Sequence, residues 1–398
     1  MTVSRTLAKL STAAVLMVFL SVSSLNAVWA DTVVATVPVG TNAEGVAFDP
    51  SNGDIYVANT VDGTVSVISG SNNSVVATVT VGTGPENIAF DPINGDVYTA
   101  NFNAGTVSAI SGTTNTVVAT VPAGAMCYDL VVDAENGNVY AASQGSDSVA
   151  VISASTNARI ANVTVGNNPI GLAYGSGVVY VANEGAGTVS LISTSTNTVA
   201  STVQVGSQPQ SLAFDTANED VYVANVASNS VSVISGSSNT VVATLPVGTY
   251  PFAVGFDPAN GDVYSVNYDS GSVSVISGKS NVVIATVKVG ILPEGIGFDS
   301  SSGNVYVPNT VSGTVSVISG ASNLLLDTVQ VGDYPFGVGY DNANGYVYVS
   351  NTDSATVSVI SPAPAASTPE FPSYGPLVAL TVSIAISVLL SPKLRNNR

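Results

Sequence analysis

Over most of the chain, apolar and polar residues alternate in short runs, the pattern expected of β-strands that bury one face. Four such runs follow one another at 45–49, 54–58, 64–68 and 75–79. Two turn sequences lie between them, Asp-Pro-Ser-Asn-Gly at 49–53 and Asp-Gly at 62–63, and both favour a reversal of the chain. The pattern predicts a unit of four short antiparallel strands.

This unit is repeated along the chain. The segment Tyr-Val-Ala-Asn at 56–59 has counterparts that begin at Tyr98, Tyr140, Tyr180, Tyr222, Tyr264, Tyr306 and Tyr348, spaced by 42 residues except once by 40. The shorter spacing arises at 174–178, where Tyr-Gly-Ser-Gly-Val shortens the first turn of the unit by two residues. Eight units of four strands predict an all-β fold, an eight-bladed β-propeller.

The order of the runs also predicts how the ring closes. Residues 33–37 have the sequence of an outermost strand, whereas the last unit ends at 356–360 without one. We therefore expect residues 33–37 to complete the eighth blade, so that no face between blades stays open. The propeller is expected to occupy residues 31–361.

The repeated segments resemble a known family. Tyr-Val-Ala-Asn, followed by Thr-Val-Ser-Val-Ile and Val-Val-Ala-Thr-Val-x-Val-Gly, is similar to the YVTN-type β-propeller repeats of archaeal surface-layer and bacterial exported proteins, over about residues 32–361. Members of that family often have seven blades, and the eight repeats found here depart from that number. The resemblance implies surface interaction or scaffolding more than catalysis.

The N-terminal segment has the features of an export signal. Arg5 and Lys9 precede an apolar run at 12–22, and the small residue Ala30 lies where a signal peptidase cuts. We interpret residues 1–30 as a signal peptide cleaved after Ala30. An uncleaved N-terminal anchor is the alternative.

The C-terminal segment predicts a membrane tether. Residues 362–370 form a Pro/Ala-rich linker, and residues 371–392 carry no charge. As a helix they would reach about 33 Å, enough to cross a bilayer, and the basic tail at 393–398 would stay in the cytoplasm. The propeller is therefore expected on the extracellular face of the cell membrane, or elsewhere on the cell surface.

A short motif gives the tether a second interpretation. Pro369, Glu370, Phe371 and Pro372, followed by the apolar segment and the basic tail, resemble the PEF-type C-terminal sorting signals of archaeal surface proteins. The resemblance implies that a sortase-like enzyme removes the helix and transfers the protein to another anchor. The helix is thus either a permanent anchor or a transient sorting helix.

Charge narrows the class of partner. The chain has eight basic and 26 acidic residues, a formal net charge of −18. The exported part keeps only Arg159, Lys279 and Lys288 against all 26 acids, a net charge of −23. Such a surface repels phosphate backbones, so we expect other surface proteins or glycans as partners and no nucleic acid. The single Cys127 cannot form an internal disulfide, and we expect it to be buried.

The residue types present restrict the chemistry. The sequence contains no His, which excludes Ser-His-Asp triads and His-ligated copper or zinc. The repeated Asp49, Asp91, Asp133, Asp215, Asp257, Asp299 and Asp341 suit either calcium ligation or capping of their own turns, and we favour capping. The repeated Tyr residues are expected to pack in the core or between blades. No cofactor and no metal is predicted.

A binding site is expected where the repeats differ from one another. The loop that leads from each outer strand into the next innermost strand faces the channel mouth of a propeller. One position there holds Glu44, Glu86, Tyr128, Ile170, Gln210, Phe252, Glu294 and Phe336, and Asn42, Met126, Tyr250, Leu292 and Tyr334 lie two residues earlier. Aromatic and acidic side chains in one mouth favour a sugar or a cationic peptide. The alternative is variable packing beneath neighbouring loops.

These observations favour a noncatalytic cell-surface scaffold for a surface layer, adhesion or partner binding. Two alternatives remain: an extracellular carboxylate- or metal-dependent lyase, lactonase or hydrolase, and binding of a small ligand in the channel. Solvated glutamates far apart on an open rim would exclude the enzyme. Asn72 and Asn162 lie in N-glycosylation sequons and are candidate sites of modification.

Overall fold

The computed structural model describes residues 30–363. Residues 30–362 form one compact unit. The predicted signal peptide up to Trp29, the sorting motif at 369–372, the helix at 371–392 and the basic tail lie outside the described residues. Among the residues that are described, no helix is both long enough and apolar enough to cross a membrane.

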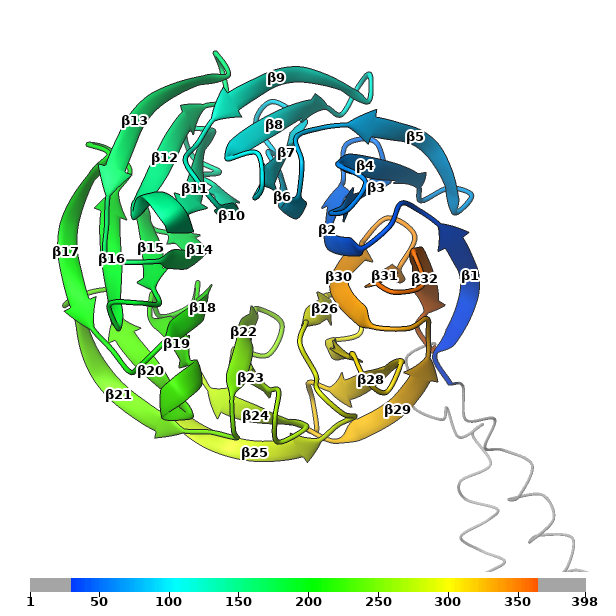
Figure 1. Ribbon diagram of the computed structural model, residues 1–398. Helices are drawn as coiled ribbons and strands as arrows, with labels where there is room; N and C mark the ends of the chain where they lie inside the picture. The colour runs from blue at the N-terminus through cyan, green and yellow to red at the C-terminus, as the bar shows by residue number, and fades with distance from the viewer. Residues whose placement is uncertain (1–29, 364–398) are drawn as a thin grey trace, which may run out of the picture. The chain divides into compact units, whose positions relative to one another are not determined.

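The described unit is a ring of eight sheets, each of four antiparallel strands, which confirms the predicted architecture (Figure 1). The innermost strands are β2 (Ala43–Asp49), β6 (Pro85–Phe90), β10 (Cys127–Val132), β14 (Pro169–Gly175), β18 (Pro209–Phe214), β22 (Pro251–Asp257), β26 (Gly297–Asp299) and β30 (Pro335–Asp341). The second strands are β3 (Asp54–Asn59), β7 (Asp96–Asn101), β11 (Asn138–Ser143), β15 (Val178–Asn183), β19 (Val221–Asn225), β23 (Asp262–Asn267), β27 (Asn304–Asn309) and β31 (Tyr346–Asn351).

The third strands are β4 (Thr64–Ser69), β8 (Thr106–Ser111), β12 (Ser148–Ser153), β16 (Thr188–Ser193), β20 (Ser230–Ser235), β24 (Ser272–Ser277), β28 (Thr314–Ser319) and β32 (Thr356–Ser361). The outermost strands are β5 (Ser74–Thr80), β9 (Thr116–Pro122), β13 (Ala158–Thr164), β17 (Thr198–Gln204), β21 (Thr240–Pro246), β25 (Val282–Lys288), β29 (Leu325–Gln330) and β1 (Thr32–Pro38). Two short 3₁₀ helices, η1 (Gln144–Ser146) and η2 (Val226–Ser228), follow β11 and β19. Blade 1 is β2–β5, and the numbering continues to blade 8, which is β30–β32 with β1.

Ring closure occurs as predicted. Strand β1 pairs antiparallel with β32, so the first and last strands of the described chain share one sheet. The closure extends to the residue before the strand, because the Tyr306 hydroxyl donates to Asp31 Oδ2 at 2.8 Å. The Asp31 amide in turn donates to Asp327 Oδ2 at 3.0 Å. Both partners belong to blade 7, so Asp31, which precedes β1 of blade 8, joins blades 7 and 8.

The repeated Tyr residues hold neighbouring blades together, as expected of core residues. Tyr56 is fully buried with Val65 and Val67 of its own blade and Val97 of the next. Its hydroxyl donates to Asn115 Oδ1 of blade 2 at 2.8 Å. A buried phenol therefore gains both apolar contact and a hydrogen-bond partner across the blade interface.

The repeated Asn residues hold each blade together internally. Asn59 is fully buried, and its Oδ1 accepts a hydrogen bond from the Gly40 amide at 3.1 Å. Its Nδ2 donates to Thr64 Oγ1 at 3.0 Å and Ser66 Oγ at 2.9 Å. A Cβ on Gly40 would lie 2.6 Å from Asn59 Cγ, so the loop approaches this amide too closely for any residue larger than Gly.

The repeated Asp residues cap their own turns, as favoured from the sequence. Asp49 Oδ1 accepts the Ser51 amide at 2.8 Å, and the other six make the equivalent bond two residues on. In the shortened turn of blade 4, Ser176 and Gly177 both have positive φ, the geometry of a tight two-residue hairpin. Cys127 is buried and unpaired, as expected.

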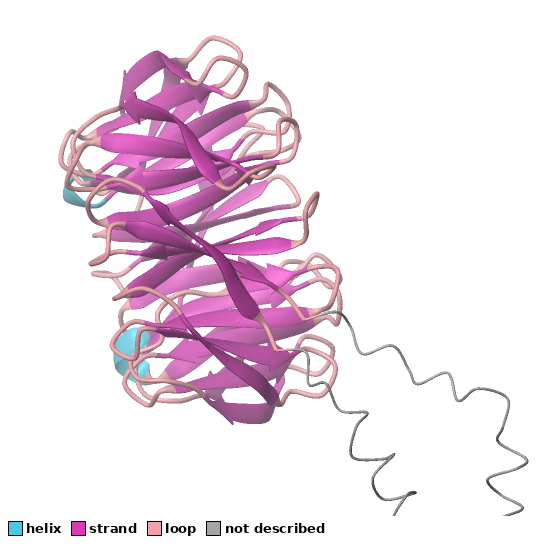
Figure 2. Cartoon of the chain, turned by 90° about the vertical axis from the view of Figure 1, so that its right-hand side faces the viewer, coloured by secondary structure: helices cyan, strands magenta, loops and turns pink. Residues whose placement is uncertain are grey.

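The ring has two distinct faces. One face carries the outer-to-inner loops and the loops between second and third strands, and we call it the mouth face. The helices η1 and η2 lie on this face, which is on the left in Figure 2. The opposite face carries the remaining turns, which are joined by bonds such as Gly70 N–H to Gly53 O at 3.0 Å. Strand β1 begins at this opposite face and β32 ends there.

Candidate channel-mouth site

Each blade places one residue of its outer-to-inner loop in the left-handed backbone region. These are Asn42, Gly84, Met126, Asn168, Gln208, Tyr250, Leu292 and Tyr334, with φ between 52° and 68°. Gly and Asn adopt this conformation readily, whereas for other residues it costs about 1–2 kcal/mol. Five blades therefore hold a longer side chain at the mouth in a strained backbone.

A backbone hydrogen bond pairs this residue with the neighbouring loop in every blade. Its carbonyl accepts the amide of the residue that follows the motif Asn, or Ser143 in blade 3, over 2.6–3.0 Å in all eight blades. The bond sets two variable side chains next to each other, as in Tyr250 with Tyr268 or Asn168 with Glu184. The mouth is thus built from two loops per blade, of which the sequence interpretation used one.

Two of the predicted carboxylates touch. The carboxyl groups of Glu44 and Glu86 are hydrogen-bonded to each other, and Asn42 Nδ2 donates to Glu44 Oε1 at 2.6 Å. Burial first, and the adjacent Glu86 second, raise the pKa of Glu44 to about 9. With this pKa, Glu44 keeps its proton at neutral pH.

The third predicted carboxylate is buried against an aromatic ring. Glu294 is 7% exposed, and the Tyr334 hydroxyl donates to its Oε1 at 3.3 Å. Desolvation raises the pKa of Glu294 to about 7. Its charge also acts on Glu44 and Tyr128, so the three glutamates share one site and do not stand apart on an open rim.

A proline explains why Glu294 leaves its strand. Pro308 of β27 lies opposite this segment and has no amide hydrogen to donate to the innermost strand. Strand β26 accordingly starts only at Gly297, and Glu294 keeps one bond to β27, from its amide to the Pro308 carbonyl at 3.2 Å. Pro293 still pairs with Asn309 of β27, so the segment stays beside β27 although the regular strand is shorter.

Aromatic rings gather beside Glu294. The ring centroids of Tyr250 and Tyr268 lie 5.6 Å apart, and those of Phe252 and Tyr268 lie 6.1 Å apart. Tyr250 is 38% exposed. On the other side of the mouth, Phe102 meets Tyr128 edge to face at 6.2 Å. The rings lie at the surface of the mouth, where a ligand can reach them.

The channel below the mouth holds a cavity of about 260 Å³. It is lined by six predicted residues, Tyr128, Ile170, Gln210, Phe252, Glu294 and Phe336, together with Asn87, Asp129 and neighbouring backbone. The Asp129 carboxylate accepts the Leu130 and Leu172 amides, both at 2.8 Å, and burial raises its pKa to about 7. The channel therefore has room for a small group.

Sequence reasoning missed three residues of the site: Tyr268, Phe102 and Asp129. Tyr268 and Phe102 follow the motif Asn, a position that differs from blade to blade. A comparison of this position between blades, in the loop between second and third strands, identifies both as variable residues. Asp129 lies one residue after the examined position, and no signal marked it. Of the residues 30–363, no group of three His, Cys, Asp or Glu is placed to hold a metal ion.

The candidate glycosylation sites lie elsewhere on the ring. Asn72 is exposed in a turn of the opposite face, where its Oδ1 accepts the Ser74 amide at 3.1 Å. Asn162 is exposed on the outermost strand β13. Both side chains are open to solvent, and their modification stays a prediction.

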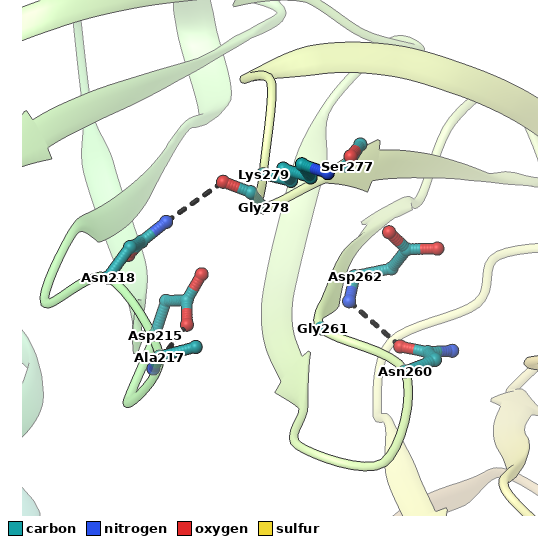
Figure 3. A pocket seen from close by; sticks show the side chains of 9 residues that line it. All are labelled: Asp215, Ala217, Asn218, Asn260, Gly261, Asp262, Ser277, Gly278 and Lys279. Carbon is teal, nitrogen blue, oxygen red and sulfur yellow. Dashed lines mark hydrogen bonds between the residues drawn. The ribbon is translucent and has the colours of Figure 1, made fainter.

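A second cavity, of about 460 Å³, opens on the opposite face between blades 5 and 6 (Figure 3). Asn218 spans the blades by donating from Nδ2 to the Gly278 carbonyl at 2.8 Å. Asn260 accepts the Asp262 amide at 2.8 Å, and Lys279 lies beside it. The same bridging bond recurs between other blades, for example from Asn52 to Gly112, so this cavity belongs to the repeated turn packing.

Comparisons with known proteins agree with this fold. The structure is similar to a chain of Kuenenia stuttgartiensis hydrazine synthase, with a TM-score of 0.59 and 15% identity, over 81% of this chain and 96% of that chain. At that identity the likeness concerns the fold alone. No curated protein matches the sequence. A family model described as YNCE-like beta-propeller matches residues 162–367, more than half of the chain. The chain therefore belongs to the YNCE-like β-propeller family.

Proposed function

We propose that this protein is a noncatalytic scaffold on the cell surface and that it binds its partner through the mouth face. The observation that carries the proposal is the strained backbone at Met126, Gln208, Tyr250, Leu292 and Tyr334. Blades 1, 2 and 4 show that Asn or Gly satisfies the same loop. Because Asn or Gly would relieve the strain in the same loop, the strained residues point to a role for their side chains.

The position of the chain ends supports this direction of binding. Strand β1 begins and β32 ends at the face opposite the mouth. A C-terminal tether, whether the helix at 371–392 or an anchor attached after cleavage at the PEF-type motif, would leave from that opposite face. The mouth face is then free to meet other surface proteins or glycans.

Replacement of the mouth side chains tests the proposal. In the full-length protein displayed on producing cells, Met126, Tyr250, Leu292 and Tyr334 are changed together to Asn, which keeps the left-handed backbone. Adhesion to a layer of isogenic cells is expected to fall at least tenfold, while Ile93→Asn on the opposite face leaves it unchanged. Equal adhesion by the mouth variant, at equal display and melting temperature, would overturn the proposal.

One observation favours a second candidate, a carboxylate-dependent hydrolase, lactonase or lyase. Burial and the adjacent Glu86 raise the pKa of Glu44 to about 9, and a protonated carboxyl group beside a second carboxyl group suits acid–base chemistry. Turnover of a lactone, ester or uronide by the full-length protein, lost at least a hundredfold in Glu44→Gln, would establish this function. Absence of turnover across all three substrate classes leaves the scaffold as the function.

A further inference from the structure

We infer that the mouth holds a binding site for an alkylammonium group, formed by Tyr250, Phe252, Tyr268 and Tyr334 around Glu294. The natural ligand would be a lysine side chain, free or N-methylated, of a partner protein. This inference rests on the proposed function and names the chemistry that the mouth recognises.

The aromatic rings have the arrangement that a cation requires. Tyr268 is the centre of the group, because Tyr250 and Phe252 lie 5.6 Å and 6.1 Å from it at interplanar angles of 49° and 35°. The Tyr250 and Tyr268 backbones are joined by a hydrogen bond of 2.9 Å, so the two rings are held together from separate loops. Ring faces within about 6 Å of an ammonium group attract it through their quadrupoles.

Glu294 supplies the negative charge at the base of this group. Its carboxyl is 7% exposed, and its hydrogen-bond partner is the uncharged Tyr334 hydroxyl. Of the basic residues of the described chain, Lys279 lies on the opposite face and Arg159 on the outermost strand β13. Lys288 lies at the mouth face, where its Nζ donates to the Ser270 carbonyl of the Tyr268 loop at 2.6 Å. A buried carboxylate gains from a counterion, and an alkylammonium ligand would bring one to Glu294.

The size and charge of the site restrict the ligand. Glu294 and Phe252 line the cavity of about 260 Å³, which has room for one side-chain end and not for a folded segment. Glu44 and Glu86 lie close enough to influence the same mouth, so anions are repelled. Uncharged sugars stack on aromatic rings as well, and a test must separate them from cations.

Choline and its uncharged isostere make that separation. The full-length protein in detergent is titrated with choline, with 3,3-dimethyl-1-butanol, which has the same shape without the charge, and with methyl glucoside. Tyrosine fluorescence and calorimetry report binding. We expect choline to bind at least tenfold more tightly than either uncharged compound. Equal affinity for the isostere, or tighter binding of the glucoside, would overturn the inference.

Variants assign the binding to these residues. Tyr268→Ala and Glu294→Gln are each expected to weaken choline binding at least tenfold, whereas Tyr268→Phe keeps it within about threefold, because the ring face remains. The matched control is Asp269→Asn, which removes one exposed charge from the same loop. If Asp269→Asn weakens binding as much as Glu294→Gln, the overall negative charge of the protein attracts the cation, and the site does not exist.

The pH dependence supplies a readout that packing alone would not change. Choline affinity is expected to rise between pH 5.5 and 8 in the wild type, as Glu294 ionises, and to rise less in Glu294→Gln. The titratable groups around Glu294 are Tyr334, Tyr268, Tyr128, Glu44 and, in the same cavity, Asp129, whose pKa is also about 7; all of them remain in the variant, so the difference between the two profiles reports Glu294. Identical pH profiles would contradict the role given to Glu294.

The inference and the proposed function fail separately. Loss of adhesion in the mouth variant together with no choline binding would refute the alkylammonium site and keep the scaffold. Choline binding that depends on Glu294, with adhesion unchanged in the mouth variant, would keep the site and refute the scaffold.

Discussion

At the scale of the residue, the left-handed positions of the mouth loops show which side chains the backbone prefers and which it only tolerates. Asn42 and Asn168 satisfy the backbone at little cost, while Met126 and Leu292 adopt the same φ against their preference. The buried motif Asn is constrained instead. Asn59 is required because its side chain joins the Gly40 amide to the Ser66 hydroxyl. Side-chain choice is free at one position and constrained at the other.

Relief of the strain at Met126 should stabilise the fold. Met126 is 42% exposed, so little apolar contact is lost in Met126→Asn. The free energy of unfolding is expected to increase by about 1 kcal/mol, because Asn tolerates the left-handed region. Chemical denaturation measures it, with Asn42→Met as the reciprocal variant, which should lose more than this amount because it also removes the hydrogen bond from Asn42 to Glu44. A less stable Met126→Asn protein would show that the methionine packs more than it strains.

The raised carboxyl pKa values make stability depend on pH. Folding raises the pKa of Glu44 to about 9 and that of Glu294 to about 7, from an ordinary 4.5. The folded state then binds more protons than the unfolded state, so this stabilisation is complete below about pH 4.5 and is lost as the pH rises through 7 and 9. We expect the melting temperature to fall between pH 5 and 9.5, and to fall less in Glu44→Gln/Glu294→Gln. A melting temperature that rises over this range would refute the assignment.

At the scale of the element, a Tyr hydroxyl donates a hydrogen bond to the next blade in six of the eight blades, and one of the six acceptors is Asp31, the residue before β1. The Tyr hydroxyls of blades 1 and 8 donate to Asn115 and Asn73 of the following blades, over 2.8 and 2.7 Å. In blade 7 the following outer strand comes from the N-terminal side, and Asp31 takes the place of the Asn. The ring thus closes through the same chemistry that joins its interior blades.

Asp31 should therefore be replaceable by Asn but not by Ala. Asp31→Asn restores the acceptor used elsewhere, and no loss of stability is expected. Asp31→Ala leaves the buried Tyr306 hydroxyl without this partner and should cost about 1–3 kcal/mol of unfolding free energy. Asn115→Ala is the matched variant within the ring. If Asp31→Ala costs nothing while Asn115→Ala does, residue 31 does not take part in closure.

At the scale of the whole molecule, the described ring places its first and last strand ends and its variable side chains on different faces. The strand ends lie at one face and the strained, aromatic and acidic side chains lie at the other. This arrangement follows from the number of strands in a blade and from the use of β1 in blade 8. One strand, β32, follows the last mouth loop; an even number of strands there would have put the end of the last strand on the mouth face.

Cysteine labelling on intact cells tests this orientation. Val61 on the mouth face is 70% exposed and Ile93 on the opposite face is 55% exposed, whereas Cys127 is fully buried and gives no background. A bulky maleimide is expected to label Val61→Cys rapidly and Ile93→Cys at least fivefold more slowly, because the proposed C-terminal tether would hold the opposite face toward the membrane. Equal rates on cells, with equal rates on detergent-solubilised protein as the control, would contradict the orientation.

Most of the fold was determined by local pattern. Alternating strands, turn residues and the spacing of the repeated Tyr specify eight four-stranded blades, and the missing last strand specifies the closure, because each feature acts over a few neighbouring residues. The variable mouth positions could also be found in this way. Because the unit occurs eight times, each local pattern can be compared in eight copies.

The site itself was decided by tertiary structure. Glu44 and Glu294 are 250 residues apart in the numbering, and only the closed ring brings their charges together. Tyr268 joins Tyr250 through a backbone bond between loops, and Pro308 shortens the strand that follows Glu294. The contacts around Glu44 and the cavity depend on distances between blades. The sequence by itself determined which residues vary at the mouth, and ring closure decided which of them meet, because spacing along a repeat does not specify contacts across the channel.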